Sequence, residues 1–88
     1  MELKDIRTEI DKIDTELASL LAQRLALSRE VAFSKRESGK AVRDTRREEQ
    51  ILRRVCELAG EENAPYVNEI YTEIMRQSRA LQENILSK

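Results

Sequence analysis

Apolar residues in the first part of the chain recur at alternating steps of three and four positions. They are Leu3, Ile6, Ile10, Ile13, Leu17, Leu20, Leu27 and Val31, with one position skipped between Leu20 and Leu27. This spacing places them on one face of an α-helix. No Gly or Pro occurs before Gly39. The pattern therefore predicts one N-terminal helix of roughly 33 residues and about 50 Å.

Two shorter apolar stripes follow the first one. The earlier of them predicts a helix over Thr45–Ala59 that ends at Gly60, a residue type favoured just after helix C-termini. The later stripe covers residues 67–85, and Asn63 and Pro65 suit the cap and the first turn of its helix. The sequence therefore predicts an all-α fold of three helices, of which the N-terminal one is very long.

The long N-terminal helix does not suit a compact monomer. A compact chain of this length has a radius of gyration near 12 Å, whereas the predicted helix would extend about 50 Å. So short a chain also builds a core that is only marginally stabilising. We therefore expect residues 1–88 to form a single domain, two copies of which intertwine as a helical homodimer.

Polar residues interrupt all three stripes at positions that face the bundle. They are Arg24, Lys35, Asp44, Arg47, Glu48, Ser78 and Gln82. A buried charge without a partner costs several kcal/mol, and arginine cannot lose its charge. The donors in this set outnumber the acceptors that two carboxylates provide. A dianionic small molecule in a pocket inside the bundle would balance that surplus.

Two purely structural explanations stand beside this one. Arg24 could form a buried ion pair with Glu48 or Asp44 that fixes the register of the helices. The run Thr45-x-x-Glu48 also fits the capping box S/T-x-x-E, so Glu48 could serve only to cap a helix start. Ser78 could be a small packing residue, and Gln82 could be only a residue at the flank of its stripe. The sequence alone leaves these alternatives open.

Composition limits the chemistry that such a pocket could perform. Sixteen basic and seventeen acidic residues leave a net charge of -1, and aromatic residues are 3%, which argues against a nucleic-acid or anionic-membrane partner. The chain has no His and a single Cys, Cys56, so we expect no metal site, no activated nucleophile and a buried structural thiol. No targeting segment or membrane-spanning apolar run is present, so we expect a cytoplasmic protein.

The polar residues, in this order, resemble the all-α, type II class of chorismate mutases over essentially the whole chain. The pattern consists of Arg7, Arg24, Lys35, Asp44-x-x-Arg47-Glu48 and Ser78-x-x-x-Gln82. The resemblance implies an intertwined homodimer with two active sites. It also implies conversion of chorismate to prephenate in phenylalanine and tyrosine biosynthesis, without cofactor or metal.

The resemblance implies that Arg24 and Arg7 of the partner subunit hold the two substrate carboxylates, assisted by Ser78. The helical geometry agrees with this division between subunits. Arg7 and Arg24 are seventeen residues apart on one helix. That separation corresponds to about 25 Å, too far for both to reach one small ligand within a chain.

The remaining candidate residues would act at the other end of the substrate. By the resemblance, Lys35 and Gln82 donate hydrogen bonds to the ether oxygen, and Glu48 with the backbone of Asp44 holds the ring hydroxyl. Arg47 orients this cluster. Together with Arg24, the residues Lys35, Gln82 and Glu48 are those implied to be catalytic.

One residue departs from the family pattern, and two rival functions follow from the same fold. Arg79 occupies a position beside Ser78 that we expect to be apolar. The nearest rival is an isochorismate-pyruvate lyase, in which we expect the Glu48 position to be apolar and the acid at Asp44 to be absent. The other rival is a non-catalytic helical dimerisation module, in which Arg24 only sets the register.

Overall fold

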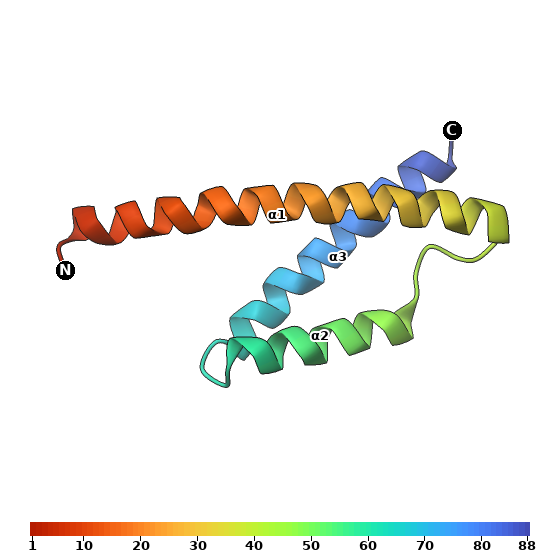
Figure 1. Ribbon diagram of the computed structural model, residues 1–88. Coiled ribbons are helices and arrows are strands. Elements are labelled where there is room, and N and C mark those ends of the chain that lie inside the picture. The colour runs from red at the N-terminus through yellow and green to blue at the C-terminus, as the bar shows by residue number, and fades with distance from the viewer.

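The computed structural model describes all 88 residues, and its secondary structure consists of three helices without a strand. They are α1 (Leu3–Ser38), α2 (Thr45–Ala59) and α3 (Ala64–Leu86). Figure 1 shows the N-terminal part of α1 extending beyond the other two helices. The predicted all-α class with three helices is confirmed.

Helix α1 contains 36 residues and ends at a glycine cap. Gly39 has φ 71° and ψ 13°, the left-handed conformation that side chains with a Cβ disfavour. Its N–H donates to the carbonyl of Lys35 at 2.8 Å, which satisfies one of the last carbonyls of the helix. The cap ends the helix and turns the chain toward α2.

The cap of α2 differs from the capping box that the sequence suggests. Asp44 is the N-cap residue, and its carboxylate accepts a hydrogen bond from the N–H of Arg47 at 3.0 Å. Thr45 is already the first helical residue, because the extended backbone of Asp44 places the cap one position earlier. The prediction that Glu48 serves a capping box with Thr45 is therefore wrong, and the Glu48 side chain is directed elsewhere.

Two further local predictions need correction at the connection between α2 and α3. Asn63 precedes α3, but its amide donates to the carbonyl of Ala59 at 3.2 Å and makes no side-chain cap of α3. Cys56 is half-buried rather than buried, and its thiol contacts the carbonyl of Ala64 at 3.6 Å. Both side chains instead stabilise the turn that joins the two helices.

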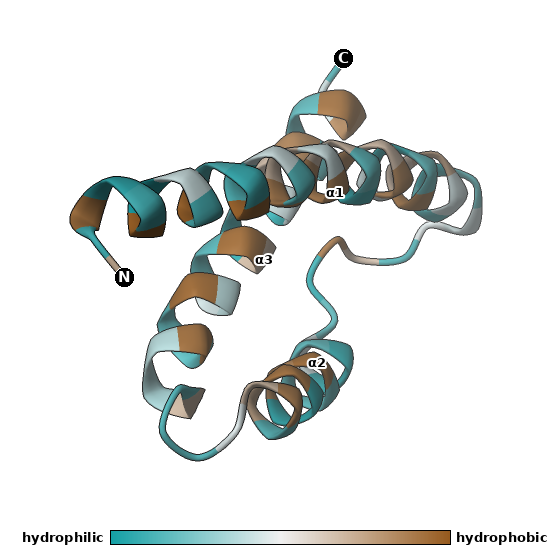
Figure 2. Ribbon diagram, turned by 60° about the vertical axis from the view of Figure 1, so that its left-hand side comes forward, coloured by the Kyte–Doolittle hydropathy of each residue, from teal (hydrophilic) through white to brown (hydrophobic).

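Helix α3 packs against both other helices, whereas α1 and α2 do not pack on each other. Figures 1 and 2 show α3 crossing α1 and joining α2 at its other end. Only five residues are buried: the apolar Ala32 and Met75, and the polar Ser28, Ser78 and Gln82. The interior of a single chain is therefore thin and largely polar.

Most of the apolar stripe of α1 is exposed in the single chain. Leu3, Ile13 and Leu20 are each more than half exposed. Figure 2 shows hydrophobic positions along α1 as far as its N-terminal end. The accessible surface is 7185 Å² for 10.2 kDa, against about 5,300 Å² for a compact monomer of that mass. The radius of gyration is 15.9 Å, above the ~12 Å of a compact chain. One chain alone leaves an extensive apolar surface uncovered.

None of the three helices combines the length and the apolar character that crossing a membrane requires.

Candidate functional site

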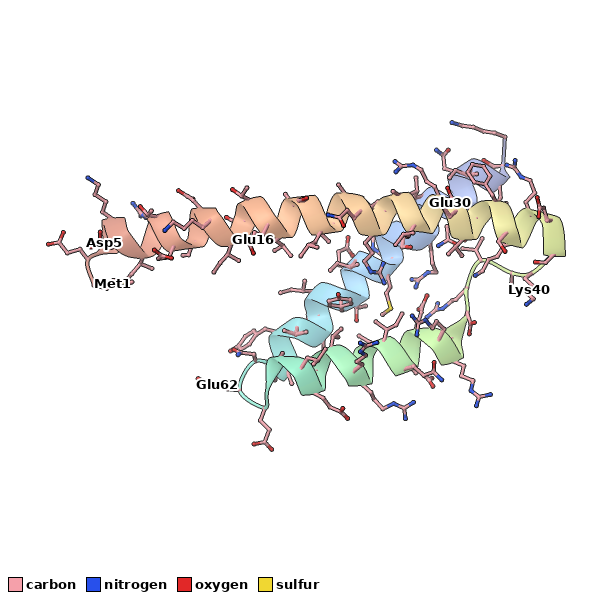
Figure 3. All side chains as sticks on the ribbon, in the orientation of Figure 1. Met1, Asp5, Glu16, Glu30, Lys40 and Glu62 are labelled. Carbon is pink, nitrogen blue, oxygen red and sulfur yellow. The ribbon has the colours of Figure 1, made fainter.

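A cavity of about 300 Å³ lies between the C-terminal half of α1, the start of α2 and α3. Its charged and polar lining consists of Arg24, Ser28, Lys35, Asp44, Arg47, Glu48, Ser78, Arg79 and Gln82. Seven of the eight site residues predicted from the sequence are in this set. Figure 3 shows side chains from all three helices entering the space between α1 and the start of α2.

Arg7 is the predicted site residue that the single chain does not bring to the cavity. It is exposed near the N-terminus of α1 and is absent from the lining. Its seventeen-residue separation from Arg24 along a continuous helix corresponds to about 25 Å.

Arg24 enters the cavity without a carboxylate partner. Its guanidinium lies 5.8 Å from the centroid of the Tyr71 ring, a cation–π distance, and it forms no ion pair within the chain. The alternative in which Arg24 pairs with Glu48 or Asp44 is therefore wrong. Tyr71 contacts the guanidinium through its ring and takes none of the N–H groups of Arg24 as hydrogen-bond donors. These N–H groups therefore remain available to a ligand.

Glu48 is paired with α3 instead. Nη1 of Arg79 donates to both carboxylate oxygens, at 2.7 Å and 2.6 Å, and the two side chains are only 21% and 17% exposed for Arg79 and Glu48. Nε of Arg43 lies 3.8 Å from the same carboxylate. The sequence singled out Arg79 only as a departure, although a carboxylate on the inner face of α2 required a facing cation.

Lys35 connects the end of α1 to the segment that follows it. Its Nζ donates to the carbonyl of Val42 at 2.5 Å, and both residues line the cavity. An ammonium group has three donors, so this bond leaves further N–H groups for a ligand. The bond also fixes the side chain at the edge of the cavity.

A buried hydrogen-bond chain crosses from α1 to α3. The Ser28 hydroxyl donates to the carbonyl of Arg24 at 3.1 Å and lies 2.7 Å from the Ser78 hydroxyl, which accepts from Nε2 of Gln82 at 3.2 Å. Because Ser28 uses its hydrogen on Arg24, Ser78 donates to Ser28. Ser28 was missed by the sequence analysis, although its position four residues after Arg24 puts it on the same face of the helix.

The hydrogen bonds between α1 and α3 leave the oxygen of the Gln82 amide unpaired. Oε1 of Gln82 is buried and has no hydrogen-bond partner. An unpaired buried polar atom costs roughly 1–3 kcal/mol, so a ligand that donates a hydrogen bond to Oε1 would recover this cost. Rotation of the amide by half a turn would exchange Oε1 for the donor Nε2 at the same place.

The lining has an excess of positive charge. Arg24, Lys35, Arg47 and Arg79 supply four cations against the carboxylates of Asp44 and Glu48, a local charge of +2. No cluster of three potential metal-ligating side chains exists in the chain. This cavity is suited to bind a small dianion through preorganised donors.

A second ion pair on α3 lies outside the cavity. Hydrogen bonds from Arg76 and Gln77 lower the pKa of Glu73 to about 2, and Arg76 contacts the carboxylate at 2.7 Å through Nε. These groups are exposed, and Arg76 does not line the cavity. Arg76 is therefore a useful comparison for Arg79, since both are ion-paired arginines of one helix.

Comparison with known proteins identifies a family and several relatives. The family model described as chorismate mutase type II matches residues 6–83. A chorismate mutase of Methanocaldococcus jannaschii is 33% identical over 99% of this chain and 90% of that protein. A bifunctional chorismate mutase/prephenate dehydratase of Buchnera aphidicola is 34% identical over 93% of this chain. No solved structure matches the chain significantly.

The relatives differ in length. The chain covers 22% of the Buchnera bifunctional protein and 22% of a bifunctional relative from Enterobacter agglomerans, which is 31% identical over 94% of this chain. The similarity to these two proteins therefore concerns about a fifth of each.

Replacing Ser28 by Ala tests the buried hydrogen-bond chain. We expect the free energy of unfolding to fall by about 1 kcal/mol, because Ser78 loses the acceptor for its hydroxyl hydrogen. Urea unfolding at a fixed protein concentration measures the change. Ser19→Ala, at an exposed serine of the same helix, should change it by less than about 0.5 kcal/mol. Equal effects of the two substitutions would show that the hydrogen bonds among Ser28, Ser78 and Gln82 do not stabilise the fold.

Proposed function

The chain belongs to the chorismate mutase type II family, and we propose that its cavity converts chorismate to prephenate. We further propose that residues 1–88 act as one domain and that the reaction serves phenylalanine and tyrosine biosynthesis. One observation carries the proposal beyond family membership. Seven residues from the three helices and the N-cap of α2 converge on one cavity whose lining has a local charge of +2, and chorismate is a small dicarboxylate.

The unpaired donors of the cavity suit the two ends of this substrate. Arg24 has no carboxylate partner in the chain, so it can hold a substrate carboxylate, with Ser78 assisting. Glu48 and the backbone of Asp44 take the ring hydroxyl, and Arg47 orients them. The cavity volume of about 300 Å³ is within the range of small-molecule pockets, roughly 300–1,000 Å³.

The rearrangement itself needs no proton transfer, nucleophile, metal or cofactor. As the C–O bond breaks, negative charge accumulates on the ether oxygen. Lys35 and Gln82 donate to that oxygen, and such preorganised donors stabilise the transition state more than the ground state. Holding both carboxylates also selects the compact conformer in which the new C–C bond can form.

A homodimer completes the site in this proposal. Arg7 lies about 25 Å from Arg24 along α1, so it serves the site of the other subunit when the long helices pair in antiparallel fashion. The accessible surface exceeds the compact-monomer value by about 1,900 Å². A standard interface buries about 800 Å² per partner, so covering the α1 stripe with a second copy is ample for a stable dimer.

Two rival functions are weaker on specific grounds. We expect the lyase of the same fold to have an apolar residue at the Glu48 position. Here Glu48 is an ion-paired residue of the cavity lining. The non-catalytic module relies on Arg24 as a register-setting ion pair, but Arg24 forms no ion pair within the chain.

Arg24→Leu tests the proposed reaction. We expect a folded protein whose kcat/KM for chorismate falls on the order of a hundredfold, because one preorganised donor of a substrate carboxylate is lost. The assay follows chorismate consumption and prephenate formation. Arg29→Leu, at an exposed arginine of the same helix, is the matched control and should retain activity.

Three results of this assay would decide against the proposal. A wild-type protein that leaves chorismate unchanged would exclude the mutase. Salicylate and pyruvate formed from isochorismate as the main products would favour the lyase. A wild-type protein without any turnover, together with an Arg24→Leu variant that is more stable than the wild type, would favour the dimerisation module.

Mixing two inactive variants tests the shared site. Arg7→Ala and Arg24→Ala should each be nearly inactive. After unfolding and refolding together, half of the dimers are mixed and each carries one intact site, so about a quarter of wild-type activity should return. Size-exclusion chromatography with light scattering checks the dimer. If both arginines served the same chain, the mixture would stay inactive.

The pH dependence tests the role of Gln82. An amide donates at any pH, so wild-type kcat/KM should not fall between mildly acidic and neutral pH. Gln82→Glu should acquire such a fall, because a carboxyl group with an ordinary pKa of about 4.3 donates only while protonated. A wild-type rate that collapses toward neutral pH would contradict this role.

A further inference from the structure

The pair of Glu48 and Arg79 is the ion pair that joins two helices in this chain. The pairs Lys12–Glu9 and Arg76–Glu73 each lie within one helix, and Arg43 belongs to the segment before α2. Arg79 is on α3, and Glu48 is in the first turn of α2. The start of α2 is therefore tied to α3 by charge as well as by apolar packing.

This tie lies on the wall of the cavity. α1 and α2 do not pack on each other, so the position of the α2 residues in the cavity depends on how α2 sits on α3. Both members of the pair are about four-fifths buried. A charged pair of this kind is less weakened by solvent than an exposed one, and it holds its members in a defined geometry.

Arg79 orients the Glu48 carboxylate but leaves some of its hydrogen-bond acceptor sites free. One nitrogen of Arg79, Nη1, contacts both oxygens of Glu48 at 2.7 Å and 2.6 Å. A carboxylate offers about four lone-pair sites, so each oxygen retains one for another donor. Without Arg79, the side chain of Glu48 would be free to sample other rotamers, and Arg43, at 3.8 Å, would be its one remaining ion-pair partner.

We propose that Arg79 is a positioning residue of this site: it fixes the Glu48 carboxylate on the cavity wall so that Glu48 accepts the hydrogen bond of the substrate's ring hydroxyl. The proposal rests on the chorismate mutase function proposed above. It also explains how this chain accommodates an arginine where we expected an apolar residue. The charge of Arg79 is matched by Glu48, so a cation at this position does not compete with Arg24 for the substrate carboxylate.

A double-mutant cycle separates positioning from direct substrate contact. The proteins are wild type, Arg79→Met, Arg79→Lys, Glu48→Gln and the double variant Glu48→Gln/Arg79→Met. Arg76→Met is the matched control, because Arg76 is an ion-paired arginine on the same helix outside the cavity. kcat and KM for chorismate are measured for each, with thermal unfolding at a fixed protein concentration.

We expect Arg79→Met to lower kcat/KM about tenfold and Arg79→Lys to recover most of the loss. In the Glu48→Gln background, Arg79→Met should change kcat/KM less than about twofold, because the carboxylate that it positions is gone. Arg76→Met should leave both parameters unchanged. A structural role of Arg79 that is independent of Glu48 would instead give the same loss in both backgrounds, and a role in holding α2 to α3 would lower the unfolding temperature of Arg79→Met and Glu48→Gln alike.

Several outcomes would overturn the proposal. An active wild type with an equally active Arg79→Met variant would do so and leave the proposed function standing. Fully additive losses would show that Arg79 acts independently of Glu48, either on the substrate itself or on the fold. A wild type without any activity on chorismate would overturn the proposed function and this inference together.

Discussion

The permanent charge of Arg24 is the constraint on which the rest of this site depends. A half-buried guanidinium cannot release its proton, so its surroundings must supply polarisable or negative groups. The chain supplies the face of Tyr71, while the cavity carboxylate of Glu48 is paired with Arg79. The charge of Arg24 therefore has no counter-ion within the chain, and the cavity lining carries a net positive charge.

Helix α3 carries both the packing and the chemistry of this arrangement. Its inner face holds Met75, Ser78, Arg79 and Gln82 within two turns, and three of these four are polar. Each polar side chain placed there takes the position of an apolar one, so the interior of one chain is thin. The same residues that give the cavity its polar lining therefore leave the interior of a single chain poorly packed.

The three-helix layout could be predicted because apolar periodicity is a local property of the sequence, and most site residues could be found as interruptions of that periodicity. Contacts between helices could not be read in this way. The pairing of Glu48 with Arg79 depends on how α2 lies on α3, which no spacing within either helix encodes. The cap at Asp44 rather than Thr45 depends on the backbone angles of one residue. Ser28 resembles an ordinary small residue until its partner on α3 is placed.

The end of α1 has a mechanical consequence. Lys35 is held twice, since its carbonyl accepts from Gly39 and its ammonium group donates to the carbonyl of Val42. Val42 and Asp44 belong to the segment that borders the cavity. Any movement of this segment that breaks the Lys35–Val42 bond also releases the ammonium group from its place. A change in the position of Val42 would therefore also change the position of the Lys35 ammonium group at the edge of the cavity.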